Sequence, residues 1–285
     1  MYDVPHLRFP EFSGEWEKCK FGDIATGFDY GMNAAAKSFD GENKYIRITD
    51  IDEASSTYGE KDMVSPDGIL SDNYLVKDRD ILLARTGAST GKSYLYKKSD
   101  GKLYYAGFLI RANVTKHNPY FVFSQLHTHR YWRWVSIMSA RSGQPGINSL
   151  EYSSFPIFTT SLHEENKISS LLYLLDERIA TQNKIIEDLK KLKSAIIENI
   201  FIDRHPNILQ LGDVGSYIRG LTYNSNDVVE QGNVLVMRSN NIINGSSLDY
   251  NNNIVSVNKQ ISAEQQLQNG DIIICMANGS SSLVG

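Results

Sequence analysis

The chain has 285 residues, of which 41% are hydrophobic and 11% aromatic, and its formal net charge is −4. This length favours two globular units, and the apolar content is sufficient for a buried core, which excludes a disordered or fibrous chain. No apolar run reaches the roughly 18 residues of a transmembrane helix, and the first residues lack a signal pattern, so we expect a cytoplasmic protein. Cys19 and Cys275 are the only cysteines, and the sequence indicates neither a disulfide framework nor a zinc site.

The acidic total conceals an uneven distribution of charge along the chain. Residues 1–84 contain 9 Lys/Arg against 17 Asp/Glu, a net charge of −8. Residues 85–150 contain 10 Lys/Arg and one acid, a net charge of +9, and residues 151–285 contain 10 against 15, a net charge of −5. Concentrated basic charge is typical of phosphate binding, so residues 85–150 are candidates for a nucleic-acid contact. A solvated basic surface without a ligand is the alternative.

The first part of the chain, to about residue 160, is predicted to be rich in strands. Runs of β-branched and aromatic residues bounded by turn residues predict strands at Lys44–Thr49, Asp80–Ala84, Lys92–Lys97 and Leu103–Val114. Asn118 and Pro119 then suit an N-cap and a first helical position, so we expect a helix to about Ser139. Its apolar side should contain Phe123, Leu126, Trp134, Val135 and Met138. A loop follows at 141–146, and the whole pattern predicts an α+β fold.

Two segments come close to motifs of catalytic proteins but lack the required spacing. Gly87–Ser93 resembles a phosphate-binding P-loop, yet three residues separate its glycines where the motif needs four. The next residues favour a strand, whereas a P-loop leads into a helix. Asn118–Tyr120 lacks the second proline of the amino-methyltransferase motif Asn-Pro-Pro-Tyr, so helix capping explains it better. We find no catalytic constellation, and the loop at 87–93 suits contacts with DNA phosphates or base edges instead.

A long helix is predicted for residues 163–201, which contain neither Pro nor Gly. Its apolar positions follow coiled-coil spacing over about five heptads with one interruption. Those that we expect to dock a partner are Leu172, Leu175, Ile179, Ile186 and Leu189. A helix with one apolar seam needs a partner helix, although an ordinary amphipathic helix packed on one domain is the alternative. At about 1.5 Å per residue, the helix would span about 60 Å.

The beginning of the chain recurs about 190 residues later. Phe21–Ile24 returns as Leu211–Val214, and Asp80–Leu83 returns as Asp271–Ile274. Further matches in the same order are Tyr45–Arg47 with Val236–Arg238, Met63–Ser65 with Ile254–Ser256, and Arg85–Gly87 with Ala277–Gly279. A long unit that is used twice, with a helix between the copies, suits a protein that handles two related halves of one object.

Together these features resemble the specificity subunit of type I restriction–modification systems. The local matches are Leu7–Phe12, Gly22–Ile24, Asp80–Gly87, Ser142–Asn148, Phe155–Ile157, the helix from His163 to Phe201, and Gly270–Ser280. Each motif is weak alone, but their ordered combination covers essentially the whole chain. The resemblance implies a first target recognition domain at 1–160, a coiled-coil spacer helix at 161–202 and a partial second target recognition domain at 203–285.

The resemblance also implies a division of labour among subunits. This chain would be non-catalytic and would bind double-stranded DNA, with each target recognition domain reading one half of a split site. The helices would act as a spacer and dock DNA methyltransferase (M) subunits, and restriction/translocase (R) subunits would complete the complex. S-adenosylmethionine, ATP and Mg²⁺ would be bound by those partners, and no cofactor by this chain.

The second copy of the repeat departs from this pattern, because it stops near the position of Gly91 in the first copy. We therefore expect the strand at Asp271–Met276 to stay frayed, or to pair with strands supplied by another chain. A second copy of the same chain is one candidate for that role. Residues 205–285 should be less stable than residues 1–201 if nothing follows Gly285.

The candidate DNA-binding residues come from two loops and one strand end. The first loop supplies Arg85, Thr86, Ser89, Lys92 and Tyr94, and the second supplies Arg141, Ser142, Gln144 and Asn148. Arg47 and Thr49 complete the set, although Arg47 could equally brace the fold. The competing hypothesis is a coiled-coil interaction protein whose strand-rich domains bind peptide or protein, and the concentrated basic charge favours DNA over it.

Overall fold

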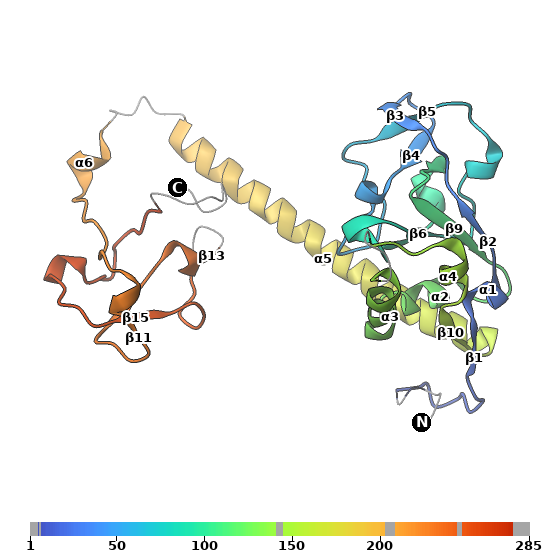
Figure 1. The fold of residues 1–285 in the computed structure, drawn as a ribbon. Coiled ribbons are helices and arrows are strands. Elements are labelled where there is room, and N and C mark those ends of the chain that lie inside the picture. Colours follow the sequence, from blue (N-terminus) through green and yellow to red (C-terminus); the bar gives the residue numbers. More distant parts are fainter. Residues whose placement is uncertain (1–4, 6, 141–144, 203–208, 244–246, 276–285) are drawn as a thin grey trace. The chain divides into compact units, whose positions relative to one another are not determined.

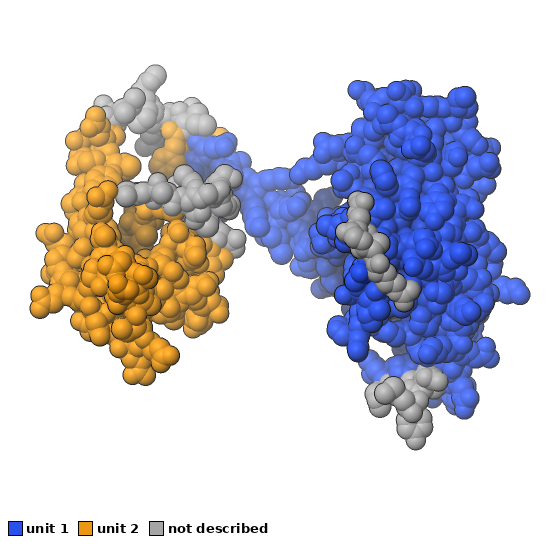
Figure 2. Space-filling model, in the orientation of Figure 1, with its two compact units in different colours: residues 1–198 blue, residues 199–285 orange. Residues whose placement is uncertain are grey.

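The computed structural model describes residues 5, 7–140, 145–202, 209–243 and 247–275. The chain divides into two compact units, residues 1–198 and 199–285 (Figure 2). Each unit is described by itself below. Among the described residues, no helix combines the length and the apolar character needed to cross a bilayer.

The first unit is built on a four-stranded antiparallel sheet. Its order is β2 (Ala25–Tyr30), β9 (Leu109–Val114), β6 (Asp80–Ala84) and β7 (Ser93–Leu95). Strand β6 has neighbours on both sides and all of its residues are buried. Because side chains alternate across a strand, Ile81 and Leu83 enter one hydrophobic core while Leu82 and Ala84 enter another. The continuous apolar sequence of β6 thus reflects burial on both faces.

Helices cover one face of this sheet (Figure 1). They are α2 (Pro119–Gln125), α3 (His129–Ser139) and α4 (Ser149–Ser153), together with the short helix α1 (Phe21–Ile24). The adjacent two-stranded pair consists of β1 (Glu17–Lys20) and β10 (Pro156–Thr159). Aromatic side chains fill the space between these layers, with Tyr131 and Trp134 packed against Phe155. Packing in the core, which the sequence favoured for Trp134, is confirmed.

Two further strand pairs extend the first unit beyond the four-stranded sheet. Strand β4 (Lys44–Ile46) runs parallel to β8 (Leu103–Tyr105), and β3 (Ala35–Ser38) runs antiparallel to β5 (Val64–Asp67). The acidic segment (residues 1–84) and the basic segment (residues 85–150) are therefore interleaved, because strands from one pair with strands from the other.

Several predicted elements prove shorter than expected. The expected helix over 119–139 is two helices, because Leu126 ends α2 and Thr128 caps α3 by accepting a hydrogen bond from Tyr131 N. The expected strand over 103–114 divides at a turn between β8 and β9. The strand expected at 44–49 ends at Ile46, and a 3₁₀ turn follows at Ile48–Asp50. The capping role predicted for Asn118 is confirmed, since its side chain accepts from Tyr120 N and Phe121 N.

The long helix is confirmed as α5 (Leu162–Ile202), a single helix of 41 residues. Its first turns are buried at Glu164, Glu165 and Ser169, whereas every residue from Tyr173 to Phe201 is exposed. Leu172 is half-buried, and the other predicted docking residues are exposed, at 51% for Leu175, 58% for Ile179, 48% for Ile186 and 59% for Leu189. The apolar seam of α5 therefore has no covering segment within the described part of the first unit.

The second unit contains short elements. After α6 (Leu211–Val214), the strands β11 (Val228–Val229), β15 (Val255–Val257) and β12 (Val234–Val236) form one antiparallel sheet in that order. A second pair is formed by β13 (Ile242–Ile243) and β14 (Ser247–Leu248).

The sequence repeat is also a repeat of hydrogen bonds. Asp23 accepts a bond of 2.8 Å from the backbone N–H three residues before it, and Asp213 accepts the equivalent bond at 2.9 Å. Asp80 does the same at 2.7 Å, and Asp271 at 2.8 Å. The two units thus share local turn chemistry at matching positions, which supports a common origin of the segments.

The units differ where the second copy of β6 should lie. Residues 271–275 form no strand, and Ile272 is 86% exposed where its counterpart Ile81 is fully buried. Met276, the last residue of the expected strand, lies outside the described residues. Within the described ranges this apolar segment pairs with no strand, and its fraying or pairing with another chain stays a prediction.

A glycine at the end of β2 permits a close approach that shapes the first unit. A Cβ atom on Gly31 would lie 2.2 Å from the backbone oxygen of Ala106, in the turn between β8 and β9. We predict that Gly31→Ala lowers the free energy of unfolding by about 1–3 kcal/mol, because the backbone must shift to accept the methyl group. Gly14→Ala is the matched control, since nothing lies within 4 Å of its Cβ position. Equal denaturant midpoints for the two variants would contradict the described packing.

Candidate nucleic-acid interface

Three separate segments meet at the carboxyl end of β6. The N–H of Arg85 donates to Phe108 O at 3.0 Å, and the N–H of Ile147 donates to Arg85 O at 2.9 Å. The N–H of Gly87 also donates to Pro145 O at 3.0 Å. The structure therefore brings together the two loops that the sequence identified separately, and adds the turn between β8 and β9.

The first of these loops is held rigidly by its own hydrogen bonds and by α3. A 3₁₀ turn spans Gly87–Ser89, and Thr90 closes it by donating its hydroxyl to Gly87 O at 2.7 Å. Gly91 has φ +96°, and a Cβ there would lie 2.8 Å from Val135 of α3. Tyr131 of the same helix donates its hydroxyl to Gly91 O at 2.8 Å. The loop is thus a fixed surface feature, as a recognition loop requires.

Arg85 lies at the centre of the three segments. Its guanidinium carbon lies 4.7 Å from the centroid of the Tyr30 ring, a cation–π contact. Among the described residues, its Nε has no hydrogen-bond partner and its side chain forms no ion pair. A planar cation that a ring supports and no carboxylate neutralises suits bidentate recognition of a phosphate or a guanine edge.

Sequence reasoning missed two aromatic residues at this surface. Phe108 is 62% exposed in the turn whose carbonyl anchors Arg85, and Tyr30 is 42% exposed beneath the guanidinium. Tyr30 also accepts a hydrogen bond from Ser149 N at 3.3 Å. For Phe108, the only signal in the sequence is its position directly after Gly107. Its exposure follows from the turn that interrupts the predicted strand. Exposed aromatic rings beside an arginine are typical of surfaces that stack on bases.

The other residues of the first loop have structural partners. The half-buried Lys92 lies 3.5 Å from the exposed Glu53, and this ion pair would have to exchange for a phosphate contact. Thr86 is half-buried and forms an isolated antiparallel bridge with Gly146. Ser89 is half-buried, and its carbonyl accepts from Lys92 N at 3.0 Å.

Tyr94 does not belong to the interface. It is fully buried in the core between β6 and the β4–β8 pair, and its hydroxyl donates to Asp100. Burial, reinforced by this hydrogen bond, raises the pKa of Tyr94 far above its ordinary value, so the phenol stays neutral. The sequence placed Tyr94 in the correct strand but on the wrong face, and Tyr94 contributes packing to the fold.

Arg47 and Thr49 lie in the 3₁₀ turn after β4. Arg47 contacts Asp50 through two hydrogen bonds of 2.7 and 2.9 Å, and the bond to Asp50 raises the pKa of the guanidinium. This geometry matches the bracing role that the sequence left open for Arg47. Thr49 is exposed.

The second loop is only partly described. Arg141, Ser142 and Gln144 lie outside the described residues, so their candidate roles stay predictions. Asn148 is exposed and caps α4, because its Oδ1 accepts from Glu151 N at 2.9 Å while Glu151 accepts from Asn148 N at 2.8 Å. This reciprocal pair is a capping box, and it fixes the point where the second loop enters the helix.

Part of the basic charge of residues 85–150 is paired with acids in three dimensions, at Lys92, Lys102 and Arg111. Lys102 lies 3.0 Å from Glu42, and Arg111 lies 3.3 Å from Asp29. These acids belong to the acidic residues 1–84, whose strands interleave with the basic segment. The net charge of +9 counted along the sequence therefore overstates the unpaired charge on the folded surface. Separation of charges along a chain differs from separation over a surface.

The described residues do not form a metal centre. The described residues contain no group of three or more His, Cys, Asp or Glu side chains placed to hold a metal ion. The 3₁₀ turn at Gly87–Ser89 leads into strand β7, as the sequence predicted, and a P-loop would lead into a helix.

Comparison with known families identifies this arrangement. Residues 13–191 match the family described as type I restriction modification DNA specificity domain. The chain belongs to this family. The matched range contains β1 to β10 and most of α5, including the three converging segments. Comparison with curated proteins found no match.

Solved structures with a similar fold come from the same kind of system. The S subunit of a type I restriction–modification system from M. genitalium matches with a TM-score of 0.52 and 16% identity, covering 80% of this chain and 60% of that one. The HsdS subunit from Thermoanaerobacter tengcongensis matches with a TM-score of 0.42 and 15% identity, covering 70% and 47%. A chain from a study of complex assembly and conformational transition in a type I R-M system matches at 0.45 and 15%, covering 68% and 47%. This chain thus spans about half the length of the structures it matches.

The capping box of α4 gives a test of the role of Asn148. We predict that Asn148→Ala lowers the free energy of unfolding by about 0.5–2 kcal/mol, because the N–H of Glu151 loses its acceptor. Asn148→Asp keeps the acceptor and should unfold at nearly the wild-type midpoint in thermal denaturation. If Asn148→Ala leaves the midpoint unchanged but weakens DNA binding, a direct DNA contact outweighs the capping role.

Proposed function

We propose that this chain is the sequence-specific DNA-binding subunit of a type I restriction–modification complex, which directs adenine methylation and restriction by partner subunits. The observation that carries the proposal is the family match over residues 13–191, which contains all of the converging segments. The surface that we propose for DNA binding consists of the rigid loops at the end of β6 and the guanidinium of Arg85.

In the proposed mechanism, some residues position the protein on the DNA backbone and others recognise bases. Arg85 and Lys92 would contact phosphates or a base edge, and the 3₁₀ turn at Gly87–Ser89 would bring small polar groups against the backbone. Phe108, exposed beside Arg85, adds a ring that can pack on a base or sugar. The contacts of Thr86, Ser89 and Asn148 stay predictions, as do those of Arg47 and Thr49.

The chemistry would belong to other subunits. M subunits would dock on the exposed seam of α5 and supply S-adenosylmethionine for adenine methylation. R subunits would bind ATP and Mg²⁺ and supply cleavage, and this chain would be non-catalytic. A second copy of the chain could provide the other half of the target. We place this activity in the cytoplasm, where the DNA substrate lies.

The competing hypothesis, a coiled-coil protein that binds peptide or protein, is disfavoured. The family match argues for DNA directly. Because three of the basic residues at 85–150 are paired with acids, the family match distinguishes the two hypotheses better than the charge does.

Salt dependence tests the role of Arg85 without knowledge of the recognised sequence. For a random-sequence duplex, Arg85→Gln should reduce the slope of log affinity against log salt by about 0.9, the contribution of one phosphate contact. The matched control is Lys98→Gln, because Tyr96 N bonds to Asp80 O and so places this basic residue at the opposite end of the β6–β7 hairpin. A folded Arg85→Gln protein with the wild-type slope would remove Arg85 from the phosphate contacts.

Assembly tests the proposed role of α5. Leu175→Glu places a charge in the apolar seam and should weaken binding to the M subunits at least about tenfold, or about 1.4 kcal/mol. Ala180→Glu adds the same charge about 140° around the helix and should leave assembly intact. Analytical ultracentrifugation of the mixed subunits measures both. Equal assembly of the two variants would show that partners dock elsewhere.

A further inference from the structure

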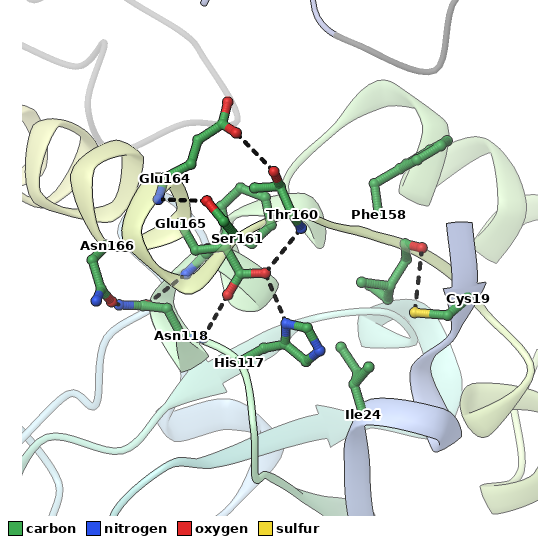
Figure 3. Close-up of polar contacts among 12 residues, drawn as sticks. Cys19, Ile24, His117, Asn118, Phe158, Thr160, Ser161, Glu164, Glu165 and Asn166 are labelled. Atoms are coloured by element: carbon green, nitrogen blue, oxygen red, sulfur yellow. Dashed lines mark hydrogen bonds and ion pairs between the residues drawn. The ribbon is translucent and has the colours of Figure 1, made fainter. Parts of the chain in front are cut away.

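Two consecutive carboxylates are buried in the first turn of α5. Glu164 is 1% exposed and Glu165 is fully buried. Figure 3 shows the contact of Glu165 with His117 and that of Glu164 with Thr160. Thr160, at the end of β10, joins the two, because its hydroxyl donates to Glu164 at 2.7 Å and its N–H donates to Glu165 at 3.2 Å.

Glu164 ties the helix to the segment that precedes β1. Arg8 donates to both of its oxygens at 2.6 Å, and Trp16 donates its indole N–H at 3.2 Å. Burial alone would raise the pKa of Glu164, but these hydrogen bonds and the charge of Arg8 outweigh it and lower the pKa. Glu164 is therefore ionised and paired in the folded protein. Lys167, one turn further along the helix, forms an ion pair with Glu11 of the same segment.

Glu165 ties the helix to the connection between β9 and α2. It contacts His117 Nδ1 at 2.8 Å and accepts from Asn118 N at 2.8 Å. The side chain of Asn118, which caps α2, also accepts from Ser169 Oγ at 2.9 Å and donates to Asn166 at 2.8 Å. One face of the first two turns of α5 is therefore bonded to the start of α2.

These bonds fix the orientation of α5 in addition to stabilising its contact with the domain. A buried carboxylate is costly to desolvate, and apolar side chains would hold a helix against a domain at lower cost. Directional bonds from two sides fix the orientation of a helix, which apolar contacts alone specify less sharply. Orientation matters here because every residue of α5 from Tyr173 to Phe201 is exposed. The direction of the whole helix is thus set by the bonds of its first turns, together with the contacts that Tyr120 of α2 makes with Tyr173 and Asp176.

A small change of direction would have a large effect at the far end. A helix of 41 residues is about 60 Å long, so a tilt of about 10° at its base displaces its end by about 10 Å. That displacement equals the length of about three base pairs of DNA.

We propose that Glu164 and Glu165 are positioning residues that fix the direction of α5 relative to the DNA-reading domain, and so set the separation accepted between the two halves of the DNA target. This inference rests on the proposed function. It assigns a specificity role to residues that lie away from the candidate DNA interface, and whose bonds would otherwise be counted as ordinary fold contacts.

The test compares spacing selectivity with DNA affinity. The full chain, assembled with its M subunits, is assayed for adenine methylation on duplexes whose half-site separation varies by one to three base pairs around the preferred value. Glu164→Gln and Glu165→Gln should reduce the preference for the native separation over its neighbours by about tenfold, a loss of about 1.4 kcal/mol of discrimination. The affinity of the domain for its half-site should stay within about twofold of wild type. Glu177→Gln, on an exposed turn of the same helix, is the matched control and should keep the native selectivity.

Variants of Arg8 keep the test decisive if a buried glutamine prevents folding. Arg8→Gln removes the ion pair with Glu164 by changing its less buried partner. Arg8→Lys keeps the positive charge but cannot donate to both carboxylate oxygens in the way that the guanidinium does. Selectivity should fall with Arg8→Gln and recover in part with Arg8→Lys. Unchanged spacing selectivity in the folded variants would overturn the proposal, because a merely structural role changes stability alone. A wild-type complex that methylates no split site would instead contradict the proposed function.

Discussion

The backbone hydrogen bonds of Ala84 and Arg85 are the constraint on which the candidate interface depends. Strand β6 ends at Ala84, whose N–H donates to Lys92 O and whose carbonyl accepts from Gly91 N and the Tyr152 hydroxyl. Arg85 follows Ala84 in the chain, and its backbone N–H and carbonyl bond to Phe108 in the turn and to Ile147 in the second loop. A buried strand thus holds three exposed segments at one edge. Residues far apart in sequence become a single surface because one backbone segment satisfies its hydrogen bonds with all of them.

The sequence predicts elements best where one local signal dominates. Strand β6 was predicted with its observed bounds, and α5 was predicted to within one residue at each end. The face of Tyr94 was not predictable, because both faces of the sheet are covered and alternation alone does not assign one. The exposure of Phe108 depends on a turn, and the neutralisation of basic charge depends on strand pairing between distant segments. Each of these is a tertiary effect without a local signal.

The repeat shows how the same local chemistry can lead to different outcomes. Arg79 has φ +71° and Gly270, at the matching position, has φ +102°, so both turns enter the next segment through the left-handed region. After Arg79 the chain becomes the central strand of a sheet, whereas after Gly270 it forms no strand in the described residues. Local turns therefore form independently of the sheet, and the strand requires its neighbours. The buried carboxylates of α5 lie in the first unit, where they bond to the connection between β9 and α2 and to the segment before β1.

The central claim is that this chain chooses the DNA sequence on which its partners act. The most direct measurement is a genome-wide map of methylated adenines in cells with the gene, without it, and with it restored. The account predicts that deletion removes methylation from one split sequence motif, and that the restored gene returns methylation to that motif alone. An unchanged set of methylated sites after deletion, with the M subunits still present, would contradict it.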